Sequence, residues 1–229
     1  MKTQKLICKR CIMDNSASNF FLDKSGCNFC NEFEKNSKHI IFESFRDKKK
    51  RLKSLVENIK RSRIKNKSKY DCIVGVSGGI DSSWCLYQAK KLGLNPLAVH
   101  MDNSWNSELA QNNISNIVKK LDVDIYTHVI EWDEYKSAMN AFFKSHVIDI
   151  ELLYDNAMLK VNYDLAKKFG IKYILSGSNH SSEGMKIPSN WSWFKYDKVN
   201  IKYLCKKFEN LKLRSLPTIG TIEYINYEF

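Results

Sequence analysis

A short glycine-rich stretch is the part of this 229-residue sequence whose residue types best suit chemistry. It reads Ser77-Gly-Gly-Ile-Asp-Ser82 and follows the apolar, β-branched run Cys72–Val76, which predicts a buried strand. A helical pattern follows over residues 81–92. Glycines at a strand-to-helix turn let backbone N–H groups approach a phosphate, and the helix N-terminus adds a partial positive charge. The stretch therefore predicts a phosphate-binding loop, in which two serines supply hydroxyls and Asp81 holds Mg2+ or caps the helix.

Four of the seven cysteines form two C-x-x-C pairs, Cys8 with Cys11 and Cys27 with Cys30, separated by 15 residues. Each pair can place two thiolates on one tetrahedral metal ion, and the spacing is typical of a small zinc ribbon or treble-clef loop. Disulfides are not favoured, because no export signal is visible at the N-terminus. An iron–sulfur cluster stays open as an alternative. We expect a structural zinc ion that folds this segment.

The elements that must position the loop alternate along the chain. Strands are predicted at residues 95–101, 123–130 and 171–176, and helices at 108–121, 132–147 and 150–169. Such alternation predicts an α/β fold with a parallel twisted sheet and helices on both faces. Polar clusters follow three of the strands, at Ser77–Ser82, Asp102–Trp105 and Gly177–Glu183. Since ligands bind beyond the carboxyl ends of parallel strands, these clusters are expected to share one site.

The formal charge of +12 is confined to one part of the chain. Residues 1–70 hold 19 basic and 7 acidic side chains, whereas residues 71–229 hold 18 of each. Between Arg46 and Lys69, 12 basic residues accompany an apolar helical stripe made of Leu52, Leu55, Val56 and Ile59. This pattern predicts a helix with a solvated basic face, and an anion-binding face stays open as an alternative. The apolar content excludes a disordered chain, and no apolar run is long enough to span a membrane.

The string Ser77–Ser82 resembles the SGGxDS pyrophosphate loop of the N-type ATP pyrophosphatases, or PP-loop superfamily. These enzymes cleave ATP to AMP and pyrophosphate while they adenylylate a carbonyl oxygen. The resemblance implies that ATP and Mg2+ are cofactors, with Mg2+ on Asp81. Catalytic roles would fall to Ser77, Asp81 and Ser82. ATP binding would use these three residues with Gly78, Gly79, Val99, His100, Met101, Asp102, Gly177 and Ser178.

Over residues 8–190 the chain resembles the N-acetyl sugar amidotransferases of bacterial O-antigen and nonulosonic acid (pseudaminic acid) biosynthesis. The resemblance combines both cysteine pairs, the basic helix, the PP-loop, the Asp102-Asn-Ser-Trp segment and residues 174–183. It implies that an N-acetyl sugar or sugar nucleotide is adenylylated and that ammonia then forms an acetamidino sugar. Two departures are Ile80, where many members have Lys, and a shorter C-terminal part. Contact with the substrate would involve Asn103, Asn179, His180 and Glu183.

Three further expectations concern organisation and partners. The predicted domains are a zinc-binding module over residues 1–40, a basic linker helix over 41–69 and a PP-loop domain over 70–229. No glutaminase motif is visible, so a partner glutaminase subunit is expected to supply ammonia. A cytoplasmic location without membrane association is expected. Nucleic acid is not favoured but stays open, since the alternative is a tRNA-modifying, thiolase-like PP-loop enzyme. A non-catalytic zinc-module adaptor is the third alternative.

Overall fold

The computed structural model describes residues 5–228, which form two compact units. One unit contains the chain up to Arg51 together with Ser178–Trp193, and the other contains Leu52–Gly177 and the chain from Phe194 onward. The sequence predicts divisions after residues 40 and 69, whereas here the division lies within a helix. The N-terminal unit also includes a segment that is distant in sequence.

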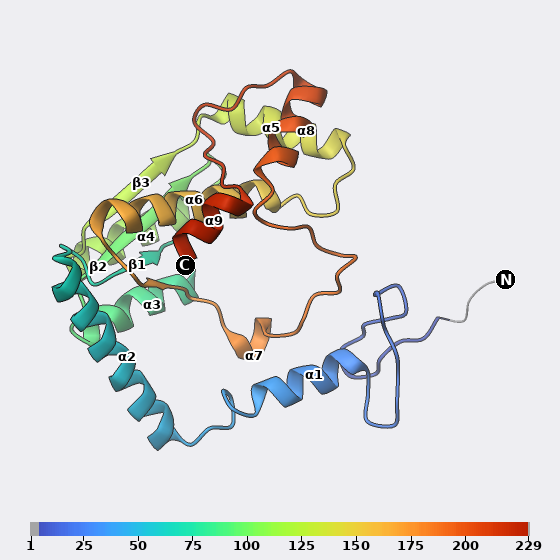
Figure 1. The fold of residues 1–229 in the computed structure, drawn as a ribbon, viewed down its shortest axis with the longest axis horizontal. Coiled ribbons are helices and arrows are strands. Elements are labelled where there is room, and N and C mark those ends of the chain that lie inside the picture. The colour runs from blue at the N-terminus through green and yellow to red at the C-terminus, as the bar shows by residue number, and fades with distance from the viewer. Residues whose placement is uncertain (1–4, 229) are drawn as a thin grey trace. The chain divides into compact units, whose positions relative to one another are not determined.

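The second unit is built on a parallel four-stranded sheet (Figure 1). Its strands are β1 (Cys72–Gly75), β2 (Pro96–Asp102), β3 (Ile125–Val129) and β4 (Ile174–Leu175), in the order β3-β2-β1-β4. In the register, Val74 lies opposite Ala98 on β2 and Leu175 on β4. The carboxyl ends of all four strands therefore face one edge of the sheet, as the alternating pattern predicts.

Helices cover both faces of this sheet, which confirms the predicted fold class. Alternate residues of β1 point to opposite faces, so that Ile73 and Val74 belong to two different cores. Helices α5 (Trp132–Lys144), α6 (Leu152–Phe169) and α8 (Lys198–Glu209) contribute to the core that contains Ile73. The core that contains Val74 includes α3 (Ile80–Lys91), α4 (Glu108–Leu121) and the C-terminal half of α2 (Phe45–Asn66).

Three elements differ from the sequence expectation. The strand β3 forms as predicted but lies at the edge of the sheet, where Ile125 is 40% and Val129 59% exposed. The predicted fourth strand is reduced to two residues in β4. On α2, Ile59 is buried, but Leu52 and Leu55 are exposed. The apolar stripe of α2 therefore packs only through its C-terminal half.

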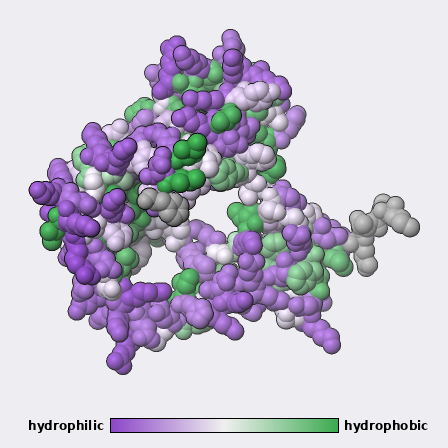
Figure 2. All heavy atoms as spheres, in the orientation of Figure 1, coloured by the Kyte–Doolittle hydropathy of each residue, from purple (hydrophilic) through white to green (hydrophobic). Residues whose placement is uncertain are grey.

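Basic residues dominate the remaining surface of α2. All but one of the basic side chains between Arg46 and Lys69 are exposed, and Lys48 is half-buried. Figure 2 shows mostly hydrophilic residues over the visible part of this helix. The predicted solvated basic face is thus present. No helix within residues 5–228 combines the length and apolar character needed to cross a membrane.

A buried amide in the second unit holds the C-terminal segment, which includes α9 (Thr221–Glu228), against α6. The side chain of Asn156 is fully buried and donates to the backbone oxygens of Lys195 (2.7 Å) and Ile219 (2.8 Å). Its oxygen accepts the backbone N–H of Ile219 at 2.8 Å. One side chain therefore satisfies three buried backbone groups from two separate stretches of chain.

Replacing Asn156 with Ala should lower the free energy of unfolding by about 3 kcal/mol, because three backbone groups then lose their partner in a water-free site. Urea unfolding followed by circular dichroism measures the change. The matched control is Asn140→Ala, an exposed asparagine on α5. Equal stability of the two variants would contradict the clamp.

A buried carboxylate performs a similar task on α5. Glu134 accepts the backbone N–H groups of Arg214 (2.8 Å), Ser215 (3.0 Å) and Leu216 (2.8 Å). Burial by itself would raise the pKa of Glu134, but these backbone donors outweigh it and lower the pKa below its ordinary value. The ionised carboxylate therefore stabilises the folded chain.

The stability that Glu134 contributes should be present above its unfolded pKa of 4.5 and disappear as the pH falls through its lower folded pKa. In a Glu134→Gln variant, the melting temperature should consequently fall less between pH 6 and pH 3 than in the parent protein. Thermal unfolding at a series of pH values measures this slope. Parallel curves for the two proteins would rule out the assignment.

Candidate functional site

The four cysteines of the first unit converge as the spacing predicts. Their sulfur atoms all lie within 4.8 Å of one another, with 3.9 Å between Cys8 and Cys30 and 3.5 Å between Cys11 and Cys27. Four thiolates about 2.3 Å from one tetrahedral zinc ion would be roughly 3.8 Å apart. The arrangement therefore fits a single zinc ion with no open coordination position, which would serve structure and not chemistry.

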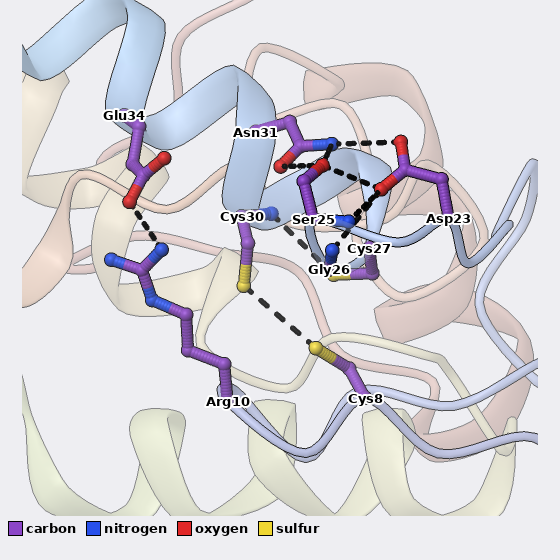
Figure 3. A network of polar contacts seen from close by, with 9 residues as sticks. All are labelled: Cys8, Arg10, Asp23, Ser25, Gly26, Cys27, Cys30, Asn31 and Glu34. Atoms are coloured by element: carbon purple, nitrogen blue, oxygen red, sulfur yellow. Dashed lines mark hydrogen bonds and ion pairs between the residues drawn. The ribbon is translucent and has the colours of Figure 1, made fainter.

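Local backbone structure explains why these thiols meet (Figure 3). Cys27 is the N-cap of α1 (Asn28–Ser37), and Cys30 lies in the first turn, where its N–H points to the Cys27 sulfur at 3.4 Å. The spacing allows either a zinc ribbon or a treble-clef loop. The position of Cys27 and Cys30 at the start of a helix corresponds to the treble-clef form. The Asp23 carboxylate accepts the N–H groups of Ser25 (2.7 Å) and Gly26 (3.1 Å), which fixes the turn before Cys27.

Backbone donors also favour the thiolate form at Cys8, whereas burial raises the pKa of Cys11. The N–H groups of Cys11 and Arg10 lower the pKa of Cys8 to about 6. Burial raises the pKa of Cys30. A metal ion would supply the charge that a buried thiolate needs, because metal binding requires deprotonated sulfur.

The segment Ser178–Trp193 folds onto this cysteine module within the first unit. Asn190 pairs with Ser18 and Ser16 through its side chain, accepting the N–H of Ser18 at 2.8 Å and donating to the Ser16 oxygen at 2.9 Å. Met185 packs against the cysteine core. The ring of His180 stacks on Phe33 at 5.8 Å. Its Nε2 lies 3.3 Å from the Ser37 hydroxyl, so both contacts attach this segment to α1.

Four predicted site residues lie in this segment, and two of them, Asn179 and Glu183, make local contacts. Asn179 caps the short helix α7 (His180–Glu183) by accepting the Ser181 N–H at 3.0 Å. The Glu183 carboxylate accepts the Asn179 N–H at 3.0 Å. Together with Ser178, these residues belong to the first unit. Their predicted role toward ATP or substrate stays a prediction.

The phosphate loop of the second unit is closed by its two serine hydroxyls. Ser82 Oγ accepts the Ser77 N–H at 3.2 Å and lies 3.1 Å from Ser77 Oγ, which in turn accepts the Gly79 N–H at 3.4 Å. The N-cap of α3 is Gly79, and no described side chain caps this helix. The first-turn N–H groups of α3 therefore point from an uncapped helix end toward any bound anion. Asp81, in that turn, is exposed.

Two glycines allow neighbouring elements to pack against this loop. Gly78 has a φ of +78°, and a Cβ atom there would lie 2.4 Å from the backbone oxygen of Ala110 on α4. A Cβ at Gly177, just after β4, would lie 2.7 Å from the carbonyl carbon of Asp81. The structure thus brings Gly177 to the start of α3, as expected for the end of the neighbouring strand. The side chain of Asn113 donates to the Gly78 oxygen at 3.1 Å, a contact that sequence reasoning missed because Asn113 lies on the polar side of an ordinary amphipathic helix.

The end of β2 lies beside this loop. Val99 and Met101 point into the core, and His100 is buried. Nδ1 of His100 lies 3.0 Å from the Val76 oxygen, one residue before the loop, and its Nε2 lies 3.4 Å from the Asn106 amide. These two contacts join His100 to the residue before the loop and to the turn that follows β2.

Asp102 and Asn103 shape the turn that follows β2. Asp102 accepts the Ser104 N–H at 2.9 Å, and Asn103 accepts the Trp105 N–H at 3.1 Å. The turn is tight, since Ser104 has a φ of +65°. Predicted contacts of Val99, His100, Met101 and Asp102 with ATP stay predictions. The arrangement offers an uncapped helix end, backbone N–H groups, two hydroxyls and one carboxylate, and these groups suit a magnesium-bound polyphosphate.

Comparison with known proteins finds a curated relative and several solved structures that are similar to this chain. The chain is 30% identical over 193 residues to the uncharacterized protein MJ1599 of Methanocaldococcus jannaschii, covering 77% of this chain and 63% of the relative. The chain thus spans less than two thirds of that protein's length. Similar solved structures include the NH3-dependent NAD synthetase of Campylobacter jejuni, at 17% identity and a TM-score of 0.45, covering 71% of this chain and 75% of that one. The NMN synthetase of Francisella tularensis matches at 16% identity and a TM-score of 0.41, covering 79% and 92%.

The family profile described as NAD synthase matches residues 51–186, which span the sheet, the phosphate loop and Gly177. ATP use is expected throughout this family, and its members form carbon–nitrogen bonds. More than half of the chain lies within the match. The chain belongs to the NAD synthase family, within the PP-loop ATP pyrophosphatase superfamily.

Proposed function

We propose that this protein is an AMP-forming carbon–nitrogen ligase that converts the acetamido group of an N-acetyl sugar, free or nucleotide-linked, into an acetamidino group. The uncapped phosphate loop over residues 77–82 is the observation that carries the ATP-dependent part. The choice of an N-acetyl sugar of bacterial surface glycans rests on the sequence resemblance. In this activity, the ATP cleavage that the family shares activates the amide group of the acceptor.

In this scheme the loop residues bind and orient the triphosphate. Backbone N–H groups and the Ser77 and Ser82 hydroxyls hold the β- and γ-phosphates, and Asp81 would hold Mg2+, which shields phosphate charge when bound. The acetamido oxygen bonds to the α-phosphorus while the bond to the bridging oxygen breaks, so pyrophosphate leaves. Ammonia then adds to the imidate carbon, and AMP departs with the former amide oxygen. Proton loss gives the amidine. Positioning and electrostatics perform the catalysis, because no protein nucleophile is required.

The cysteines argue against a sulfur-transferring enzyme of the same superfamily. All seven lie within the described residues, and four of them form the metal cluster. Burial raises the pKa of Cys72 to about 12 and that of Cys205 to about 11, and both thiols are fully buried. Cys85 is half-buried, and burial raises its pKa as well. None of these last three thiols, Cys72, Cys205 and Cys85, resembles a reactive thiolate. The basic face of α2 favours a tRNA substrate, but the cysteines do not fit sulfur transfer. The thiolase-like enzyme is therefore the less favoured alternative.

The test is an assay with ATP, Mg2+, ammonium and a panel of free and nucleotide-linked N-acetyl sugars. We expect AMP and pyrophosphate in equal amounts and a product in which one oxygen is replaced by an NH group, detected by mass spectrometry. Glutamine should replace ammonium only after a partner glutaminase is added. If no sugar in the panel elicits AMP release while tRNA binds in a salt-sensitive manner, the alternative replaces the proposal.

A further inference from the structure

Two exposed tryptophans stand side by side at the carboxyl edge of the sheet. Trp105 follows β2 and Trp132 follows β3, and their ring centroids are 6.0 Å apart with an angle of 43° between the planes. Trp105 is 58% exposed and Trp132 40%. Two adjacent exposed indoles form an apolar surface that core packing does not explain.

The Trp105 ring is held by buried neighbours. Tyr135 is buried and meets Trp105 edge-on, with 6.2 Å between ring centroids and an angle of 83°. Buried Asn103 accepts the Trp105 backbone N–H and also hydrogen-bonds the Tyr135 side chain. A rigid aromatic surface with one open face loses little conformational entropy when it binds a ligand.

The tryptophan pair lies at the same edge of the sheet as the phosphate loop. Ser107, two residues after Trp105, is the N-cap of α4, and the first turn of α4 contains Ala110. Ala110 lies against Gly78 so closely that no Cβ fits between them. Five residues separate Trp105 from Ala110, so their Cα atoms are at most about 18 Å apart. A ligand on the tryptophans is therefore within reach of a triphosphate on the loop.

Polar groups around the pair suit a ligand that carries hydroxyls. Asp102 and Asn106 lie in the turn that holds Trp105, 3.4 Å apart. Glu151 is exposed and lies close enough to Tyr135 for its charge to help raise the pKa of that phenol, which burial raises most. A pyranose ring presents C–H groups on its faces and hydroxyls at its rim, so an aromatic face flanked by carboxylates and an amide matches it.

We infer that Trp105 and Trp132 form the acceptor platform, on which the pyranose ring of the substrate stacks while its hydroxyls bond to the flanking carboxylates. This inference rests on the proposed function. It assigns substrate contacts to two residues that are not among the substrate residues expected from the sequence, although Trp105 ends one of the polar segments expected at the site.

The experiment measures AMP release at saturating ATP and ammonium while the concentration of the acceptor is varied. UDP-N-acetylglucosamine and free N-acetylglucosamine are the first probes, followed by the remaining panel. In Trp105→Ala the KM for the active sugar should rise about tenfold or more through lost apolar contact, while the KM for ATP stays within twofold. Trp105→Phe keeps an aromatic face and should restore most of the affinity. Tyr203→Ala, an exposed aromatic on α8, is the matched control.

Two of the three outcomes test the platform alone, and the third tests the proposed function on which it rests. If the parent protein turns over a sugar and Trp105→Ala leaves its KM unchanged, the platform is wrong and the function stands. If Trp105→Ala raises the KM for ATP instead, the tryptophans hold adenine and the platform is overturned. If the parent protein turns over no sugar, both proposals fail together. Circular dichroism of each variant checks that the fold is intact.

Discussion

A single methyl group added at Gly78 should weaken ATP binding about a hundredfold, whereas the same methyl group at Gly75 should be tolerated. In Gly78→Ala the new Cβ would meet the backbone of Ala110 at 2.4 Å, and the φ of +78° is unfavourable for any L side chain. The loop or the first turn of α4 must then shift. A shift of about 1 Å in a phosphate-binding loop is sufficient to cost roughly a hundredfold in affinity or rate.

Gly75 is the matched control because it lies in β1, three residues earlier, with nothing within 4 Å of its Cβ position. Calorimetric titration with a non-hydrolysable ATP analogue and Mg2+ measures the difference. The melting temperature of Gly78→Ala shows how much of the effect is a loss of stability. Equal affinities for Gly78→Ala and Gly75→Ala would refute the close packing of loop and helix.

Removal of the metal should release the segment Ser178–Trp193. Zinc binding to a four-cysteine module contributes about 10 kcal/mol or more to its folding. Without it, the cysteine core beneath Met185 and the turns that present Ser16 and Ser18 to Asn190 lose the bonds that join the two cysteine pairs. After chelation, amides of the segment should exchange with solvent orders of magnitude faster, and trypsin should cleave after Lys186.

Hydrogen exchange followed by mass spectrometry measures this release, and peptides from β1 and β2 serve as the internal standard. The substitution Cys8→Ser should reproduce the effect without chelator, whereas Cys85→Ser on α3 should leave the segment protected. Unchanged protection of residues 178–193 in the metal-free protein would show that these contacts do not depend on the cluster.

The parts of this structure that local patterns could predict are those with one dominant physical cause. Apolar β-branched runs and helical spacing predict β1, β2, α3 and α4 to within a residue or two at each end, and the C-x-x-C pairs predict the cluster of four cysteines. The phosphate loop was predictable because Gly78 and its neighbours combine a strand, a turn and a helix start within ten residues.

The remaining features depend on contacts between residues that are distant in sequence. Nothing local shows that β3 forms an exposed edge, since its residues suit a buried strand equally well. Asn156 and Glu134 lie on the apolar faces of their helices. Their polar character suggests a buried hydrogen bond, but the sequence does not show which backbone groups they bind. The attachment of Ser178–Trp193 to the cysteine module depends on Asn190 and His180, whose partners lie more than 140 residues away.

The two compact units are interleaved in sequence, which limits how recombination could exchange them. A module that begins and ends within one continuous stretch can be gained, lost or exchanged by a single recombination event. The cysteine module is completed by residues 178–193, which are encoded inside the PP-loop domain. A chain cut at residue 70 would leave Met185 and His180 without the surfaces they cover. One cut in the chain therefore cannot separate a complete cysteine module from the PP-loop domain, and a transplanted cysteine module should fold well only with its distant segment.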